Sequence, residues 1–550
     1  MVTTNLHSGI GGGCSRASFG RESVVTWDSR RRTRVVTALA LVVSAALVVA
    51  GCSGGGAGAS TSADIDRSAV LRFANQYGAV SFDPHRTPSP STDAMFQRNV
   101  YDTLVTQAAD DDGKAVLEPR LATEWTIADD AKTIDFTLRE GVRFQDGTEF
   151  NAAAVKANLD RARDPQSKVS SYLETLDTVE VVDPAHVRLH LSEGTPDLIW
   201  LLAGNTVGNM ASPAAFNTDL ATKPVGTGPY TLTTFSPNEV KLTRWDGYWN
   251  FDEVELAGID YSIVPDDNAR LSGLRSNQFD VAPFPAPGDM AAKRLVDSNG
   301  FQWQDALAAT PLGLYLNQTK APFDNPDVRR AIYLAIDRTM IAEGLFSGSV
   351  LPTGQFFSPI SDAGWNGDID VEASYDPDEA RKLIRAAGAE GARVTIAHPQ
   401  VAVSMTLAQA LQDQLGKIGL DVQLIPYSAT ESLQSYLRGE TMAAVQSPYG
   451  SVDPRTAVEG TLLGDRNLGT PSPEVVRLAQ DAETYPVGSA ERNAAYIELN
   501  DFVAANPENF VPIFIQRNGL LLSSKVVLDR KNLFSEATPK IDWVGVGLGR

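Results

Sequence analysis

The alternation of apolar and polar residues is clearest over residues 133–139. Every second position there is apolar, which is the period expected of a strand with one buried face, and the apolar positions are Ile134, Phe136 and Leu138. The polar run 129–132 predicts a turn that leads from 125–127 into this strand. Asn151 predicts the N-cap of a helix over 152–163, because a short polar side chain suits that position and apolar residues follow at helical spacing.

The rest of the first half gives shorter signals. Strands are expected over 69–74 and 187–191, and a helix over 96–104. The glycines and prolines of 224–230 predict a tight turn that leads into another strand.

In the second half, helical and strand patterns alternate. Pro326 and Pro377 suit the first turns of helices because the missing N–H is not needed there, and Asp376 precedes Pro377 as a cap. Residues 394–396 and 419–424 predict strands on either side of an amphipathic helix over 402–418. This alternation predicts an α/β layer.

Length and charge narrow the class of protein. A chain of 550 residues exceeds one typical domain, so at least two cores are expected. Six arginines and two acids precede Cys52, so the remainder carries 41 basic and 66 acidic residues, a formal charge near −25. This acidity argues against nucleic acid as a partner, which needs clustered cations.

The N-terminal residues have the pattern of an export signal. Five residues, Arg30 to Arg34, carry four arginines and precede an uncharged run over 35–51 that ends next to Cys52. The final residues resemble a bacterial lipobox, so we expect 1–51 to be a signal peptide and Cys52 to be acylated. A membrane-spanning helix is the alternative, but the apolar run is at the short limit for a span. Residues 52–64 are expected to form a flexible tether.

Several further observations concern chemistry. Cys14 would leave with the signal and Cys52 would carry lipid, so no intramolecular disulfide is expected. His186 and His190 lie four apart, but their neighbours alternate as in a strand, which disfavours a metal site. Asp110 to Gly113 predicts a hairpin turn rather than a calcium loop. No motif for a catalytic group, a metal or a cofactor is present. We therefore expect no catalytic residue, no bound metal and no cofactor.

Several segments resemble the signature of the family 5 extracellular solute-binding proteins, the receptors that deliver peptides, nickel complexes and other solutes to ABC importers. The segments that carry the resemblance are Pro119, Leu121–Ala122, Trp125, Phe136, Leu138–Arg139, Gly141–Val142, Phe144, Asp146–Gly147, Phe150–Ala152, Val155–Lys156, Gly226–Tyr230, Arg244–Trp249, Pro322–Ile332 and Tyr375–Ile384. Asn277 departs from the family pattern, which has glycine there.

The resemblance implies a fold and a domain plan. The fold would be α/β and two-lobed, like the type II periplasmic binding proteins with an extra domain, and the ligand cleft would lie between the lobes. Lobe I would comprise 65–106, 210–306 and 516–550, with 107–209 inserted as a subdomain. Lobe II would comprise 307–515.

The resemblance also implies a function and a site. The chain would be a substrate-binding lipoprotein of an ABC importer, held on the outer face of the cell membrane, which captures short peptides and passes them to membrane permease subunits. We expect it to be a monomer and not an enzyme. Asp453 would pair with the ligand's ammonium group, although an Asp that only caps the turn before Pro454 is an equal alternative. The other candidate ligand contacts are Tyr449, Gln446, Asn317 and Tyr77.

The residues leave open both the solute and the class of protein. Within the same role, the solute could be a nickel chelate, an oligosaccharide or another small molecule, because Gly450 stands where many peptide receptors have an Asp. From another class, the chain could be a surface hydrolase or a signalling receptor, and a hydrolase would need polar residues that converge in the cleft.

Overall fold

The computed structural model describes residues 65–550 except 111–112, 129–130, 196, 286–288, 297–299, 368, 370, 449–450 and 536–538. The predicted signal peptide, Cys52 and the tether lie outside the described residues. Residues 60–550 make up one compact unit. Within the described residues, no helix combines the length and the apolar character needed to cross a membrane.

A sheet of 12 described strands runs through this unit, in the order β16-β15-β17-β13-β18-β11-β1-β10-β9-β8, with β12 and β14 also paired to β18. The strands are β1 Val70–Asn75, β8 Tyr230–Ser236, β9 Glu239–Arg244, β10 Gly258–Ile263, β11 Val281–Pro285, β12 Phe301–Leu307, β13 Leu312–Leu316, β14 Val350–Pro352, β15 Arg393–Pro399, β16 Asp421–Tyr427, β17 Ala443–Gln446 and β18 Phe510–Ser523.

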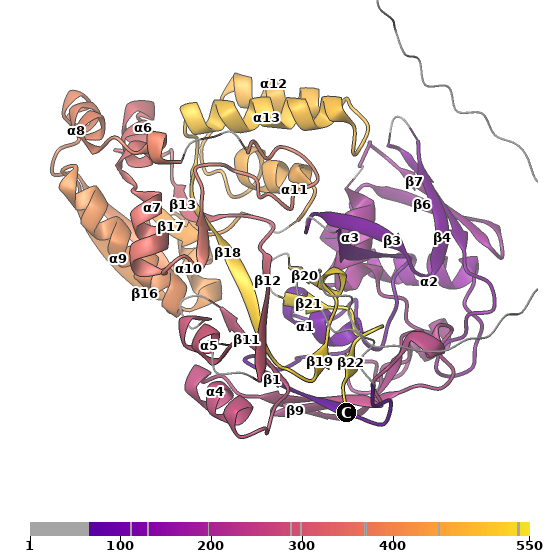
Figure 1. Ribbon diagram of the computed structural model, residues 1–550. Coiled ribbons are helices and arrows are strands. Elements are labelled where there is room, and N and C mark those ends of the chain that lie inside the picture. Colours follow the sequence, from indigo (N-terminus) through magenta and orange to yellow (C-terminus); the bar gives the residue numbers. More distant parts are fainter. Residues whose placement is uncertain are drawn as a thin grey trace, which may run out of the picture. The chain divides into compact units, whose positions relative to one another are not determined.

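Strand β18 joins the two halves of this sheet. Its first half pairs with β13 and β14, and its second half pairs with β11 and β12 (Figure 1). The indole of Trp303 on β12 covers Gly519 on β18 so closely that a Cβ atom at Gly519 would lie 1.8 Å from the ring. Only glycine therefore fits this position without displacing the tryptophan.

A separate four-stranded sheet has the order β4-β5-β7-β6, and its strands are β4 Ala122–Ile127, β5 Thr133–Leu138, β6 Leu176–Asp183 and β7 His186–Leu191. It confirms the predicted strands over 133–139 and 187–191. The three alternating apolar side chains of β5 are buried. Helix α2, Ala152–Ala162, follows β5, and its predicted cap is confirmed because the Asn151 side chain accepts the N–H of Ala154 at 3.1 Å.

Three small strand pairs complete the described sheets: β2 Val105–Ala109 with β3 Ala115–Pro119, β19 Val526–Val527 with β22 Gly547–Leu548, and β20 Leu533–Ser535 with β21 Pro539–Ile541. The predicted hairpin turn after Asp110 joins β2 to β3. Within it, the backbone N–H of Lys114 donates to Asp110 Oδ1 at 2.8 Å. Asp110 thus acts as a turn residue, as the sequence predicted.

The remaining α-helices are α1 Pro90–Gln97, α3 Leu198–Gly204, α4 Asp267–Arg275, α5 Asp289–Val296, α6 Pro326–Ala335, α7 Arg338–Met340, α8 Pro377–Ala386, α9 Ala402–Lys417, α10 Ala429–Leu437, α11 Pro454–Val458, α12 Pro473–Ala482 and α13 Ala490–Ala505. The short turns are η1 Ser170–Leu173, η2 Thr206–Gly208, η3 Pro213–Ala215, η4 Phe251–Glu253, η5 Ile341–Leu345, η6 Glu372–Ser374, η7 Glu459–Leu463 and η8 Arg530–Asn532, of which η5 and η7 are π-helical. Helices α12 and α13 lie side by side (Figure 1).

The predictions for the second half are confirmed. Pro326 and Pro377 open α6 and α8, and the Asp376 side chain accepts the N–H of Glu379. The strand, helix and strand predicted over 394–424 correspond to β15, α9 and β16. Parallel pairing of β15 with β16 across α9 gives the α/β layer that the pattern indicated.

The prediction of a helix over 96–104 is wrong. Helix α1 ends at Gln97, and the amide of Asn99 then donates to the carbonyls of Met95 and Phe96. Beyond it the chain bonds to the glycine-rich turn, because Gly228 N–H donates to Val100 O at 2.9 Å. A Cβ atom at Gly228 would lie 2.6 Å from the Val100 carbonyl carbon, so glycine permits this approach. Tertiary hydrogen bonds have here replaced the helix.

Buried side chains fall into several clusters. One lies on the four-stranded sheet and is built mainly from residues 104–210, a second surrounds β13, α6 and α9, and a third surrounds β1 and β10. The first cluster also contains Ile360 and Val452, so part of the chain beyond β13 packs against the 104–210 region.

Candidate functional site

Helix α11 begins at a residue that the sequence singled out. Asp453 is fully buried at its N-cap, where Oδ1 accepts the backbone N–H of Arg455 at 2.8 Å. Pro454 occupies the first helical position, where no N–H donor is required. Helix α11 therefore begins here because Asp453 caps it and Pro454 suits its first position.

Capping uses only one oxygen of Asp453. The same Oδ1 also faces Arg492 Nη2 at 3.0 Å, whereas Oδ2 has no hydrogen-bond partner. A buried oxygen without a partner retains the cost of its desolvation. Asp453 can thus accept another donor while it caps the helix.

Arg492 is the buried cation that compensates Asp453 and two further acids. It lies near the start of α13 on the face that also carries Tyr496 and Leu499, and its side chain is 0% exposed. Besides Asp453, its guanidinium lies 3.3 Å from Asp362 and 3.4 Å from Glu483. Sequence reasoning missed Arg492, although its spacing from Tyr496 and Leu499 was a signal that it lies on the apolar face.

A loop of the four-stranded-sheet region meets α11 at this point. Thr456 Oγ1 donates to Asp197 Oδ2 at 2.5 Å, across 259 residues of sequence. The Arg455 guanidinium donates to the carbonyl of Gly194 and lies 3.9 Å from Glu193. Asp197 is buried and its Oδ1 has no partner.

We name these groups the carboxylate cluster: Asp197, Asp362, Asp453 and Glu483, with Arg455 and Arg492. Burial raises the pKa of Asp197 to about 7, and the nearby charge of Asp453 adds to that rise. Burial is also the main cause that raises the pKa of Asp362 and of Glu483. Four carboxyl groups thus share two guanidinium groups, an arrangement that favours a proton or a cationic group.

Three of the other predicted ligand contacts, Asn317, Tyr77 and Gln446, lie in the part of the chain that the structure describes. Asn317 is buried, and its Oδ1 accepts the N–H and the hydroxyl of Thr319, which fixes a turn. Tyr77 is 50% exposed in the loop after β1. Gln446 is the last residue of β17 and is partly buried. Tyr449 lies outside the described residues, and these four assignments stay predictions.

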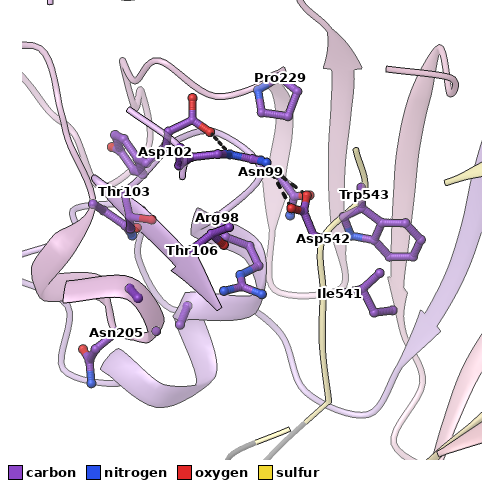
Figure 2. Close-up of a pocket in the computed structure, with 16 residues that line it drawn as sticks. Arg98, Asn99, Asp102, Thr103, Thr106, Asn205, Pro229, Ile541, Asp542 and Trp543 are labelled. Atoms are coloured by element: carbon purple, nitrogen blue, oxygen red, sulfur yellow. Dashed lines mark hydrogen bonds and ion pairs between the residues drawn. The ribbon is translucent and has the colours of Figure 1, made fainter. Parts of the chain in front are cut away.

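A second polar site lies beneath the C-terminal segment. Asp102 and Asp542 face one another there (Figure 2), and Arg120 bridges them at 2.8 and 3.0 Å. The remaining space is about 20 Å³, enough for one water molecule but not for a peptide. This pocket is a packed ionic joint rather than a solute site.

The histidines that the sequence flagged are paired individually on the surface. His186 Nδ1 lies 2.9 Å from Asp183, and His190 Nε2 lies 2.8 Å from Glu180, both on the confirmed strand β7 and its partner. Across the described residues, no group of three or more His, Cys, Asp and Glu side chains has an arrangement that could hold a metal ion.

Solved structures share the fold. The periplasmic binding protein DppA from Helicobacter pylori, in complex with the peptide STSA, has 24% sequence identity and a TM-score of 0.73, covering 88% of this chain and 98% of that one. NikA from Brucella suis, in complex with Fe(III)-EDTA, has 20% identity and a TM-score of 0.74, covering 87% and 99%. The fold is therefore the two-lobed α/β fold of the periplasmic binding proteins, as expected.

The family can also be stated. The model for "Bacterial extracellular solute-binding proteins, family 5 Middle" matches residues 116–467, so the chain belongs to this family. The glutathione-binding protein GsiB of Salmonella typhi is 34% identical over 322 residues, which cover 56% of this chain and 61% of GsiB. The chain thus spans about six-tenths of the length of the curated relatives it matches. These relatives are solute-binding proteins.

Proposed function

We propose that this chain is the extracytoplasmic receptor of an ABC importer, which closes on a solute and delivers it unchanged to a membrane permease. Membership of the solute-binding family supports the role. The continuous strand β18, shared by both halves of the large sheet, supports a mechanism in which one half moves relative to the other. No chemical conversion of the solute is part of this proposal, and we propose that the receptor acts as a monomer.

The proposed lobe boundaries are those expected from the sequence. Lobe I comprises 65–106, 210–306 and 516–550, the subdomain 107–209 is inserted in it, and lobe II comprises 307–515. The crossover after β12 and the centre of β18 would act as the hinge, since both lie where the pairing partners of β18 change.

We propose short peptides with a free amino terminus as the solutes. The observation that carries this is the unpartnered Oδ2 of the buried Asp453. A buried carboxylate that can accept one more donor suits an ammonium group, because burial of an unpaired charge on either side is costly. The peptide bound to H. pylori DppA is consistent with this class.

Glutathione is a specific candidate within this class. The 34% identical relative is named for binding it, and glutathione is a short peptide that carries an ammonium group. A metal chelate remains the alternative solute, since NikA with the same fold is complexed with Fe(III)-EDTA.

We also propose that Cys52 anchors the receptor by an attached lipid on the outer face of the membrane, after removal of 1–51. The lipobox-like residues before Cys52 support this. Replacement Cys52→Ala should move the chain from the membrane fraction to the soluble fraction and remove incorporation of labelled palmitate.

Native mass spectrometry of the receptor purified from its own host tests the solute class. A co-purified peptide whose mass is unchanged after incubation supports the proposal. A bound metal complex or sugar replaces the peptide assignment, and hydrolysis of the peptide would replace the receptor role by an enzyme.

The role of Asp453 is tested with glutathione and its N-acetylated form. Asp453→Asn should weaken binding of free glutathione by about 30-fold or more, because one partner of a buried charge pair is lost. N-acetylation should cost the unmodified receptor a similar factor and the variant little. The exposed Asp465→Asn serves as the control and should bind like the unmodified receptor. If Asp453→Asn also binds normally, Asp453 only caps α11.

A further inference from the structure

We propose that Asp197 and Thr456 form a proton-gated latch, so that the loop that carries Asp197 closes onto α11 more readily when Asp197 carries a proton. This inference rests on the proposed cleft, since it concerns how that cleft closes. It adds a regulatory property of the carboxylate cluster, namely that acidification favours the closed form.

The contact between Asp197 and Thr456 joins two proposed parts of the molecule. Asp197 belongs to the proposed subdomain 107–209, whereas Thr456 belongs to proposed lobe II. Their side chains meet at 2.5 Å, and Arg455 reaches the Gly194 carbonyl beside them. A second contact between the same two parts joins Lys114 Nζ to the Asp362 carbonyl at 3.1 Å. These hydrogen bonds exist only while the two parts are close.

Few contacts between helices and strands hold this joint closed. Among the described elements, no helix or strand of 107–209 packs extensively on a helix or strand of 312–505. Side chains, rather than shared strands, therefore hold the parts together here. Opening would expose the apolar contact of Ile360 and Val452, but would break no sheet.

Charged groups from several elements surround Asp197. Asp197 faces Asp453, Arg455 and Glu459 from the α11 segment, and Glu193 lies on its own loop. Glu483, directly after α12, and Arg492 from α13 complete the cluster. Arg455 also pairs with Glu459, Glu483 and Glu193. Its single positive charge is therefore not available to Asp197 alone.

A proton on Asp197 would balance the excess of negative charge around it. In the contact seen here, burial raises the pKa of Asp197 to about 7, whereas an aspartate freed into water has a pKa near 3.9. Between these values the open form is ionised and the closed form is protonated. Closure therefore takes up a proton, becomes less favourable as the pH rises from about 4 to about 7, and changes little above that.

The direction of the hydrogen bond gives a second prediction. The Thr456 hydroxyl donates to Asp197 Oδ2 and so lowers the pKa of Asp197 relative to burial alone. Thr456→Val removes this donor at nearly constant volume. Its latch should therefore remain protonated to a higher pH than that of the unmodified protein.

Two measurements on the full chain, without added solute, test the latch. Infrared difference spectra between about pH 8 and 5.5 should show the carbonyl stretch of a protonated carboxyl growing as the pH falls, with a midpoint below pH 7 because the ionised open form competes with the protonated closed form. This band should be smaller in Asp197→Asn, where only other buried acids such as Asp362 and Glu483 contribute, and shifted to higher pH in Thr456→Val. Small-angle X-ray scattering should show the radius of gyration fall over the same range, whereas Asp197→Asn should keep the smaller value throughout.

Glu193→Gln provides the matched control, because this acid lies on the same loop but its side chain is 67% exposed. It should titrate like the unmodified protein. The latch is overturned if the band is absent from the unmodified protein at low pH, if Asp197→Asn retains it at full intensity, or if the band appears while the radius of gyration stays constant. Because no solute is added, these outcomes are independent of whether the receptor binds peptides.

Discussion

The buried guanidinium of Arg492 stabilises three carboxylates that water does not reach freely. We predict that Arg492→Met lowers the free energy of unfolding by about 3–5 kcal/mol, because loss of one partner leaves buried charges uncompensated. Urea denaturation measures the change. Arg477→Met is the control, since Arg477 pairs with Glu474 and Glu498 at the surface and such pairs contribute about 0–1 kcal/mol. Equal small losses in both variants would show that the cluster tolerates an uncompensated acid.

Sequence could predict only part of this site at the level of single residues. Asp453 was found through the family resemblance and its position before Pro454, and the structure shows the cap without excluding ligand contact. Asp197 and Glu483 could not be found, because each reads locally as a polar residue at a helix end. Their shared environment arises only when distant segments of the chain meet.

The end of helix α4 shows how one residue controls an element. Asn277 has φ +59°, its N–H donates to Leu274 O, and Gln278 N–H donates to Gly273 O, which is the Schellman arrangement. We predict that Asn277→Ala costs about 1 kcal/mol of unfolding free energy, because a Cβ atom is strained in this conformation, whereas Asn277→Gly should cost less. Both variants lose the weak contact with Arg72, so their difference in urea denaturation reports the backbone alone. Equal stabilities would contradict this.

Elements with a clear period were predictable, and elements decided by tertiary bonds were not. β5 and α9 follow the period of their own apolar residues, so local sequence was sufficient. The expected helix over 96–104 failed because Asn99 bonds to the last carbonyls of α1 and the following residues bond to the turn at Gly228. Neither partner can be identified from spacing within the segment.

At the scale of the whole molecule, the α/β class and the family followed from the sequence, but the role of β18 did not. This strand pairs with residues roughly 200 positions earlier in one half of the sheet and roughly 240 positions earlier in the other. Its own sequence has two apolar stretches, 510–515 and 520–522, separated by Gln516 to Gly519, and each stretch fits any buried strand. Only the fold shows that one strand connects two cores.

This connection makes a prediction about cooperativity. Leu314 on β13 and Ile259 on β10 are fully buried in different clusters, on opposite sides of β18. Leu314→Ala and Ile259→Ala should each cost about 2–5 kcal/mol. Because β18 is hydrogen-bonded to both halves, neither half can unfold without losing a strand, so both substitutions should lower the same calorimetric transition. The exposed Val181→Ala should leave it nearly unchanged. Two transitions, each lowered by only one of the substitutions, would show that the halves unfold independently and that β18 does not couple their unfolding.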